Sequence, residues 1–335
     1  MTAYEHIFPV FDYGEISRDE LAPERLLDTL QTYGYFYLSG LDPIIPPRLF
    51  KSLRDVAGNF FASPLPVKMG YYIGDSAHHR GYVPVTEKGA YGDEKQRVYE
   101  AFDIGYEAPE LPSHQRKGFE LVGPNRYPPH VPAMESTLTT YYHANFEISQ
   151  TLLRLIARGS GLSDRHFEPH ITRPASQLRL IHYLANDVQV HSQEASMGAH
   201  TDYELFTILH QTSPGLVAYN RRAQRWQHMP VFKNALLVLV GDMLQFLTNG
   251  RLKSLLHRVV ATGEERYSFP FFMNLDFETR LQPLPQYGGS DETVVVGHHL
   301  LGQLYRDFPY IKRRIDSGVW PVDFAIPERN AYEQV

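Results

Sequence analysis

The first half of the chain carries apolar residues at intervals of three and four, the spacing of one face of a helix. This spacing predicts three helices, over Leu21–Tyr33, Pro46–Phe60 and Pro132–Arg158. The first should end at Gly34, a residue type that commonly terminates helices, and the short apolar run that follows it reads as a strand. We expect the longest of the three to be a structural support packed against a sheet.

After about residue 176 the pattern changes to short apolar runs separated by turn residues, which favours strands. The predicted strands are Gln177–Leu184, Leu205–His210, Gly215–Tyr219, Ala235–Val240, Ser254–Ala261 and Arg266–Asn274. Many short strands at this spacing are typical of a sandwich or barrel. A last helix, Leu300–Ile315, could cover the mouth of a pocket.

Composition narrows the classes of protein. The 335 residues are 43% hydrophobic and 21% charged, as in an ordinary globular enzyme, and no apolar run reaches the length of a membrane span. The absence of cysteine excludes disulfides, cysteine-ligated clusters and thiol nucleophiles. A net charge of −6 argues against nucleic acid as a partner. Because Met1–His6 lacks the pattern of a secretory signal, we expect a cytoplasmic protein.

The strongest chemical signal is His200-Thr201-Asp202 followed by His257. In an extended backbone, side chains two positions apart point to the same side, so His200 and Asp202 can face one ion. Two imidazoles and one carboxylate suit Fe(II) and leave coordination positions open for chemistry. The chain has 16 histidines, so the first pair alone is weak, and the second histidine strengthens it. Arg266 and Ser268 have the same spacing, nine and eleven residues beyond His257.

These segments resemble the iron(II)/2-oxoglutarate-dependent oxygenases, in the isopenicillin N synthase-like branch. Gly198–Tyr203 resembles the first ligand segment of the family, and Gly241–Val259 the second. Arg266-Tyr267-Ser268 looks like the pair that holds the distal carboxylate of the co-substrate. Shorter matches extend the resemblance over nearly the whole chain, at Pro9–Asp12, Gly34–Tyr37, Arg80–Tyr82, Glu100–Asp103 and Leu178–Tyr183.

The resemblance implies an α+β protein with a double-stranded β-helix, or jelly-roll, core flanked by helices. Its expected organisation is an N-terminal dioxygenase-like region (1–130), supporting helices (131–175), the jelly-roll core (176–285) and a C-terminal helical lid or tail (286–335). It also implies Fe(II), 2-oxoglutarate and O2 as cofactor and co-substrates. The metal ligands would be His200, Asp202 and His257, and Arg266 and Ser268 would hold 2-oxoglutarate.

Other residues are candidates for the pocket wall. Arg179 and Tyr183 share a strand face, so Tyr183 is expected at the co-substrate and Arg179 at the substrate, with a structural ion pair as the alternative for Arg179. Tyr203 is expected to wall the substrate pocket or else to pack in the core. Glu100 and Phe102 lie on a segment that resembles one approaching the pocket, although Glu100 could equally be a solvated side chain.

Three functions fit these observations. The favoured one is oxidation, most simply hydroxylation, of a small-molecule metabolite with conversion of 2-oxoglutarate to succinate and CO2. The second is an oxidase like isopenicillin N synthase, which takes its electrons from the substrate instead, and the third is a non-catalytic metal-binding relative. Because all the site residues are present, the non-catalytic interpretation ranks last. We expect a monomer or weak homo-oligomer with no membrane partner, and the sequence does not name the prime substrate.

Overall fold

The computed structural model describes residues 8–87, 98–110, 121–185, 195–327 and 330–332. The segment considered above for a secretory signal, Met1–His6, lies outside them. The helices are α1 (Tyr13–Ile16), α2 (Ala22–Tyr33), α3 (Pro47–Phe61), α4 (Leu65–Met69), α5 (Met134–Gly159), α6 (Asp242–Leu247), α7 (Val296–Asp307) and α8 (Pro309–Asp316). No helix in the described part of the chain has the length and apolar character to cross a membrane.

Two sheets form the core. The larger has eight strands in the order β1 (Val10–Asp12), β2 (Tyr35–Ser39), β10 (Leu236–Val240), β7 (Phe206–Gln211), β12 (Arg266–Met273), β5 (Gln177–Tyr183), β4 (Tyr99–Gly105) and β3 (Gly81–Val83). The smaller has the order β6 (Ala195–His200), β11 (His257–Val260), β8 (Leu216–Asn220) and β9 (Arg225–His228). A short hairpin-like pair, β13 (Arg280–Leu281) and β14 (Val294–Val295), lies apart. This is the jelly-roll α+β fold that the family resemblance implied.

Strand β10 shows why the core has two layers. All five of its residues are apolar and buried, because both faces of the large sheet are covered. Leu236, Val238 and Val240 belong to one hydrophobic cluster, whereas Leu237 and Leu239 belong to another. Alternate residues of a strand point to opposite faces, so the first cluster lies on the helix side of the sheet and the second between the two sheets.

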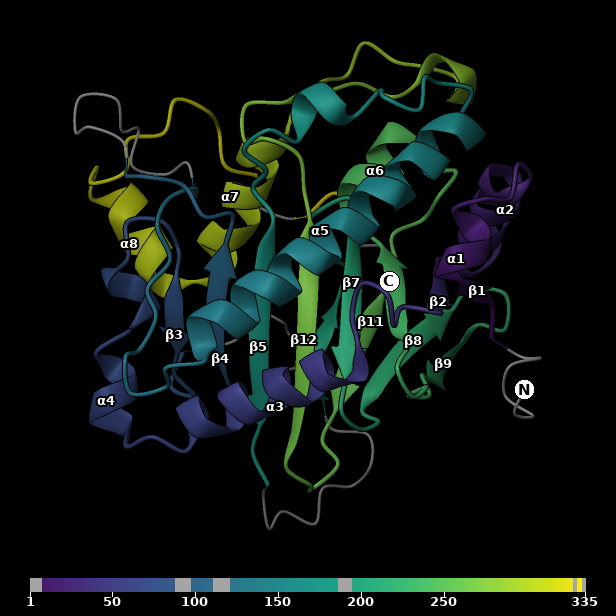
Figure 1. The fold of residues 1–335 in the computed structure, drawn as a ribbon. Coiled ribbons are helices and arrows are strands. Elements are labelled where there is room, and N and C mark those ends of the chain that lie inside the picture. Colours follow the sequence, from purple (N-terminus) through teal and green to yellow (C-terminus); the bar gives the residue numbers. More distant parts are fainter. Residues whose placement is uncertain (1–7, 88–97, 111–120, 186–194, 328–329, 333–335) are drawn as a thin grey trace.

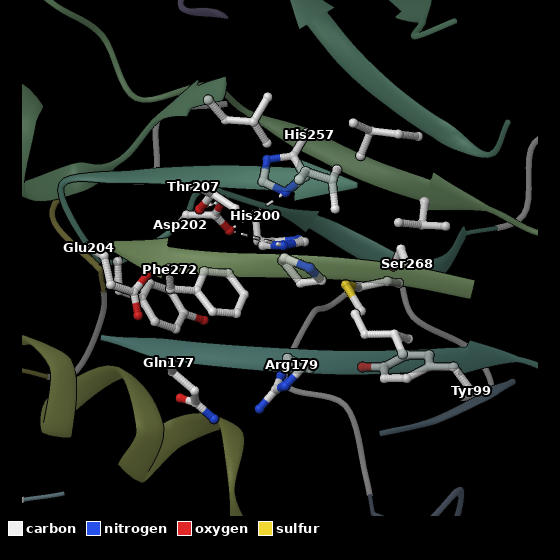
Figure 2. Close-up of a pocket in the computed structure, with 18 of the residues that line it drawn as sticks. Tyr99, Gln177, Arg179, His200, Asp202, Glu204, Thr207, His257, Ser268 and Phe272 are labelled. Carbon is white, nitrogen blue, oxygen red and sulfur yellow. Dashed lines mark hydrogen bonds and ion pairs between the residues drawn. The ribbon is translucent and has the colours of Figure 1, made fainter. Parts of the chain in front are cut away.

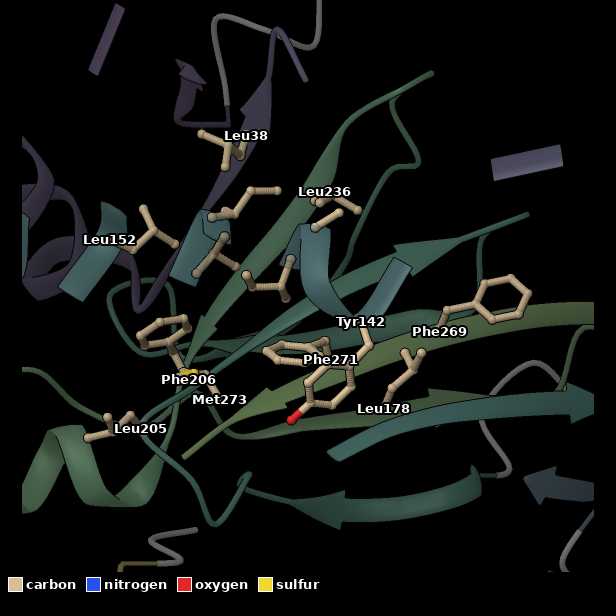
Figure 3. Packing of buried hydrophobic residues seen from close by; sticks show 14 of the residues in the cluster. Leu38, Tyr142, Leu152, Leu178, Leu205, Phe206, Leu236, Phe269, Phe271 and Met273 are labelled. Atoms are coloured by element: carbon tan, nitrogen blue, oxygen red, sulfur yellow. The ribbon is translucent and has the colours of Figure 1, made fainter. Parts of the chain in front are cut away.

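The helix side is covered mainly by α3 and α5, which cross in front of the large sheet in Figure 1. Tyr142 of α5 packs edge-on against Phe271 of β12, with ring centroids 5.0 Å apart (Figure 3). Leu152, further along the same helix, lies in the same cluster as Leu38 and Leu236. The long helix is therefore the structural support that its pattern predicted.

Most predicted elements are confirmed to within a few residues, and the differences have local causes. The single late helix expected over Leu300–Ile315 is two helices, because the chain turns into an extended conformation at Phe308, before Pro309. The sequence pattern missed β4, which is buried along its entire length and so lacks alternation. Both late helices pack against the cluster between the sheets, with Leu301 and Ile311 fully buried.

Candidate active site

The two histidines of the motif meet because β6 and β11 are neighbouring antiparallel strands. His200 and His257 stand directly opposite each other in the register, and their ring centroids are 4.3 Å apart. Each ring Nδ1 hydrogen-bonds a backbone carbonyl two residues earlier, Gly198 at 2.8 Å and Leu255 at 2.9 Å. These bonds place the proton on Nδ1 and leave both Nε2 atoms as acceptors, the form that binds a metal.

Asp202 completes the group from the segment after β6, which ends at His200, two residues before the carboxylate. Its carboxylate Oδ1 lies 3.9 Å from Nε2 of His200 and 3.7 Å from Nε2 of His257. Thr207 donates a hydrogen bond to the other oxygen, Oδ2. The carboxylate therefore presents one oxygen to the space between the imidazoles.

The donor set fits a divalent iron ion. One ligand atom from each of His200, Asp202 and His257 lies within 4.8 Å of the others, and all three residues are buried. Burial is the largest of the effects that lower the pKa of His200 to about 4, so this imidazole is neutral at physiological pH. Neutral imidazole nitrogen together with one carboxylate oxygen is the chemistry that Fe(II) prefers in oxygenases with open positions.

Two buried polar residues brace the loop that carries the ligands. The backbone N–H of Asp242 donates to the carbonyl of Asp202 at 2.8 Å. Asn330, from the C-terminal segment, donates to the Asp242 carboxylate at 2.7 Å and to Thr201 at 3.3 Å. Thr201 faces this bracing network, away from the other two residues of the motif. The C-terminal segment thus fixes the residue between two metal ligands.

A cavity of about 970 Å³, its open mouth included, contains the three residues. It lies between the two sheets, and its floor consists of alternate residues of β5 and β12. These floor residues are Gln177, Arg179, Ile181 and Tyr183 on β5, and Arg266, Ser268, Pro270 and Phe272 on β12. Leu304, Asp307 and Phe308 also line the cavity, so the late helical segment contributes to its wall.

One end of the cavity floor carries a buried cation that can bind an anion. Arg266 is buried, and its Nη2 atom has no hydrogen-bond partner among the described residues. Its guanidinium lies 3.6 Å from the ring centroid of Tyr183, and Ser268 follows on the same face of β12. The close approach of Gly215 is required, because a Cβ there would lie 2.6 Å from Arg266 Cζ. Tyr183, Arg266 and Ser268, the three residues predicted to hold the co-substrate, therefore lie in the same cavity.

Arg179 and Tyr203 both reach the cavity, and each also has a protein partner. Arg179 forms a two-point ion pair with Asp103, at 2.8 and 2.7 Å, so the structural alternative for this residue holds alongside its place in the wall. Tyr203 donates a hydrogen bond to Asp307 at 2.5 Å. That bond links the segment that carries Asp202 to Asp307, the last residue of α7, in the cavity wall.

The expectation for Glu100 and Phe102 is corrected, because both face the helix side of the sheet. In the β4–β5 register Glu100 pairs with His182 and Phe102 with Leu180, whereas the cavity residues of β5 are the odd-numbered ones. Phe102 is fully buried in the helix-side cluster. The residue of β4 that lines the cavity is Tyr99, which is opposite Tyr183.

The opposite end of the cavity from Ser268 contains polar residues that the motifs did not assign. Figure 2 shows Glu204 and Gln177 with Phe272 on one side of the metal group, and Ser268 and Tyr99 on the other. Burial is the main cause that raises the pKa of Glu204 to about 8. The position of Glu204 directly after Tyr203 was the available signal, but nothing in the sequence links it to Gln177.

The fold, the three donors and the anion pocket together define a metal-dependent oxygenase site. Comparisons with known proteins agree. The family profile described as "2OG-Fe(II) oxygenase superfamily" matches residues 175–275, and that described as "non-haem dioxygenase in morphine synthesis N-terminal" matches residues 8–130. A structure from Caulobacter crescentus, assigned to the 2OG-Fe(II) oxygenase family, superposes with a TM-score of 0.76 at 26% identity, covering 89% of this chain and 98% of that one.

Curated relatives agree as well. Clavatol oxidase of Penicillium crustosum is 30% identical over 298 residues, 84% of this chain and 86% of the relative. A 2-oxoglutarate-Fe(II) type oxidoreductase of Emericella nidulans is 28% identical over 281 residues, 79% of each protein. The chain belongs to the 2OG-Fe(II) oxygenase superfamily. It is an Fe(II)- and 2-oxoglutarate-dependent dioxygenase that oxidises a small molecule with O2 and converts 2-oxoglutarate to succinate and CO2.

Proposed function

We propose that this enzyme hydroxylates a small organic molecule, with Fe(II) held by His200, Asp202 and His257, and 2-oxoglutarate held by Arg266, Ser268 and Tyr183. Fe(II) would supply the activation of O2 that converts a substrate C–H bond to C–OH while 2-oxoglutarate loses CO2. The protein supplies position and a dry site. The observation that carries the assignment is the buried, unpartnered Arg266 Nη2 in the same cavity as the three metal donors.

Each side chain has a defined task in this proposal. Arg266 offers two parallel donors to the far carboxylate of 2-oxoglutarate, and Ser268 adds a hydroxyl on the same strand face. Tyr183 holds the guanidinium flat against its ring, which fixes the direction of those donors. Thr207 orients the Asp202 carboxylate, and Tyr203 with Asp307 keeps the mouth narrow so that water is excluded.

The alternative without 2-oxoglutarate fits less well. A buried arginine with an unsatisfied donor carries a free-energy cost of roughly 1–3 kcal/mol or more, which an internal carboxylate would have removed. Two of the carboxylates that line the cavity, Asp202 and Asp307, accept hydrogen bonds from Thr207 and Tyr203. The unused donor of Arg266 therefore fits a ligand carboxylate. A peptide substrate also has a carboxylate, so the preference for 2-oxoglutarate rests on relatives such as the 2-oxoglutarate-Fe(II) type oxidoreductase.

Titration of 2-oxoglutarate into Fe(II)-loaded protein, without O2, tests whether Arg266 holds the far carboxylate. Arg266→Ala should weaken binding by about ten- to a few hundredfold, the equivalent of one or two charge-assisted hydrogen bonds. Arg266→Lys should recover only part of the loss, because an ammonium cannot present two parallel donors. Arg48→Ala removes an exposed arginine on α3 and serves as the matched control. Unchanged affinity in Arg266→Ala would show that the far carboxylate is held elsewhere.

We further propose that the enzyme works in the cytoplasm as a monomer or weak homo-oligomer, without nucleic acid as a partner. The net charge of −6 supports the last point, because phosphate backbones are bound by basic surfaces. Sedimentation analysis at micromolar protein concentration would test the oligomeric state. A stable dimer there would contradict this part of the proposal.

A further inference from the structure

We infer that Glu204 and Gln177 form a subsite for a nitrogen-bearing substrate, one that presents an N–H donor of an amide, amine or nitrogen heterocycle. The inference rests on the proposed function, because it assigns the prime substrate to the end of the cavity that 2-oxoglutarate leaves free. It commits the substrate to a chemical class and names the two residues that select it. It adds to the iron and 2-oxoglutarate residues without altering their roles.

The register of the strands separates the two ends of the cavity. On β12, Ser268 pairs with Ile181 and Phe272 pairs with Gln177, so the residue pairs lie four positions apart, roughly 13 Å along the strand. Phe272 also pairs with Thr207, three residues after Glu204. Figure 2 shows the metal group between these ends, with Glu204 and Gln177 together on the side away from Ser268. A substrate at this end lies across the metal group from the co-substrate.

Glu204 is a buried carboxyl group in the cavity wall. Its side chain is part of a residue only 5% exposed, and none of the ion pairs among the described residues includes it. The nearby cation, Arg179, is already engaged by both oxygens of Asp103. A carboxyl group keeps at least one acceptor oxygen whether or not it carries a proton. Its complement on a ligand is therefore a hydrogen-bond donor.

Gln177 supplies the second half of the subsite. It is 8% exposed, lines the cavity, and its Nε2 atom has no hydrogen-bond partner among the described residues. A buried amide donor without a partner is costly, so its persistence in a cavity wall indicates a ligand or bound water. Whichever way the amide is turned, it offers one donor group and one acceptor. Together with Glu204 it matches a group that both donates and accepts, as an amide or a lactam does.

Charge at this end disfavours an acidic substrate. Among the described residues of this end of the wall the cation is Arg179, and both oxygens of Asp103 engage it. A ligand carboxylate placed here would therefore find no unpaired cation. Phe272 and Phe308 supply flat apolar surface on which a ring can stack. These features together select neutral or cationic nitrogen compounds.

Equilibrium dialysis of small probes against anaerobic protein loaded with Fe(II) and 2-oxoglutarate tests the inference by binding alone. The probes are 2-pyridone with N-methyl-2-pyridone, and benzamide with acetophenone. Each pair differs mainly in whether the N–H donor is present. The donor-bearing probe of each pair should bind about tenfold more tightly, the factor expected for one hydrogen bond to a buried carboxyl group.

Glu204→Met removes both acceptor oxygens at similar side-chain length, and it should reduce each preference to within about threefold. Glu204→Asp keeps the carboxyl group and should retain part of it. Glu147→Met, an exposed change on α5, should leave the preference intact. Equal affinities within the pairs for the unmodified enzyme, or a preference that survives Glu204→Met, would overturn the subsite. Failure of the unmodified enzyme to bind 2-oxoglutarate would instead overturn the proposed function, so the two failures are distinguishable.

Discussion

The two faces of the large sheet bury charge in different ways. On the helix side, Glu100 receives hydrogen bonds from Lys68 at 2.6 Å and Tyr82 at 2.5 Å, and lies 2.9 Å from Nδ1 of His182. On the cavity side, Arg266 and Gln177 each keep a buried nitrogen without a partner among the described residues. The helix face thus holds Glu100 in a fully partnered network, whereas the cavity face holds a paired cation, Arg179 with Asp103, beside buried groups without a partner among the described residues.

The difference separates structural charge from functional charge without reference to any motif. A buried ionic group that is fully partnered within the protein holds the fold together, and removing one partner destabilises it. A buried polar group left unpartnered weakens the fold, so one that lines a cavity indicates a ligand or a bound water there. Glu100 and Arg266 are both buried and charged, and only their partners tell them apart. Substitutions on the cavity face should therefore change binding, and those on the helix face should change stability.

The largest effect is expected at the metal group. His257→Ala removes one of three donors, and Fe(II) affinity should fall by more than the roughly 10- to 100-fold that loss of an outer hydrogen-bonding partner costs. Turnover should be lost with it. Metal content after gel filtration, together with succinate formation, measures both effects. His228→Ala, an exposed histidine on β9, is the control, and full iron occupancy in His257→Ala would contradict the assignment.

On the helix face, Lys68→Met should lower the free energy of unfolding by about 3–5 kcal/mol, because it leaves the buried Glu100 without its cation. The side chains of this pair are 10% and 3% exposed. Lys51→Met breaks an exposed pair with Asp55 on α3, and should cost no more than about 1 kcal/mol. Urea unfolding measures both. If Lys68→Met weakened 2-oxoglutarate binding and left stability unchanged, the division between the faces would fail.

A smaller effect is expected from Gly215→Ala, which adds a methyl group where Arg266 Cζ would be 2.6 Å away. The guanidinium must move from its place, so 2-oxoglutarate should bind about three- to tenfold more weakly, a loss of up to roughly 1.4 kcal/mol. Gly58→Ala on α3 is a suitable control, because its nearest neighbour would be Tyr267 Oη at 3.7 Å. Unchanged affinity would show that the position of Arg266 is adaptable.

The smallest effect concerns pH. Burial raises the pKa of Glu100, but hydrogen bonds with His182, Lys68 and Tyr82 outweigh it, and the net pKa is lowered. A lowered folded-state pKa stabilises the protein above the unfolded value of about 4.3 and loses that contribution as the pH falls below it. The stability difference between the unmodified protein and Glu100→Gln should be constant from pH 7 to about 5 and shrink below. A difference that grows on acidification would contradict this.

Local spacing predicted two pairs of site residues, whereas the third metal ligand, His257, followed from the resemblance to the family. His200 and Asp202, and Arg266 and Ser268, are two residues apart, so strand alternation alone predicts a shared direction. The assignment of Glu100 to the cavity failed for the complementary reason. Alternation says that Glu100 and Tyr99 point to opposite faces, but the face that meets the cavity is set by the register with β5, far along the chain. Gln177 shares the strand face of Arg179 and Tyr183, but nothing in the sequence pairs it with Glu204.

The hydrogen bonds from Asn330 to Asp242 and Thr201 have a consequence for how the enzyme is made. A separation of 129 residues lies between Thr201 and Asn330, so at about 5–20 residues per second a ribosome needs roughly 6 to 26 s to synthesise the intervening chain. Throughout that interval the nascent polypeptide already contains His200 and Asp202, but their loop lacks its final support. Iron captured at that stage would be held by a looser loop, which favours loading of the metal after synthesis and release.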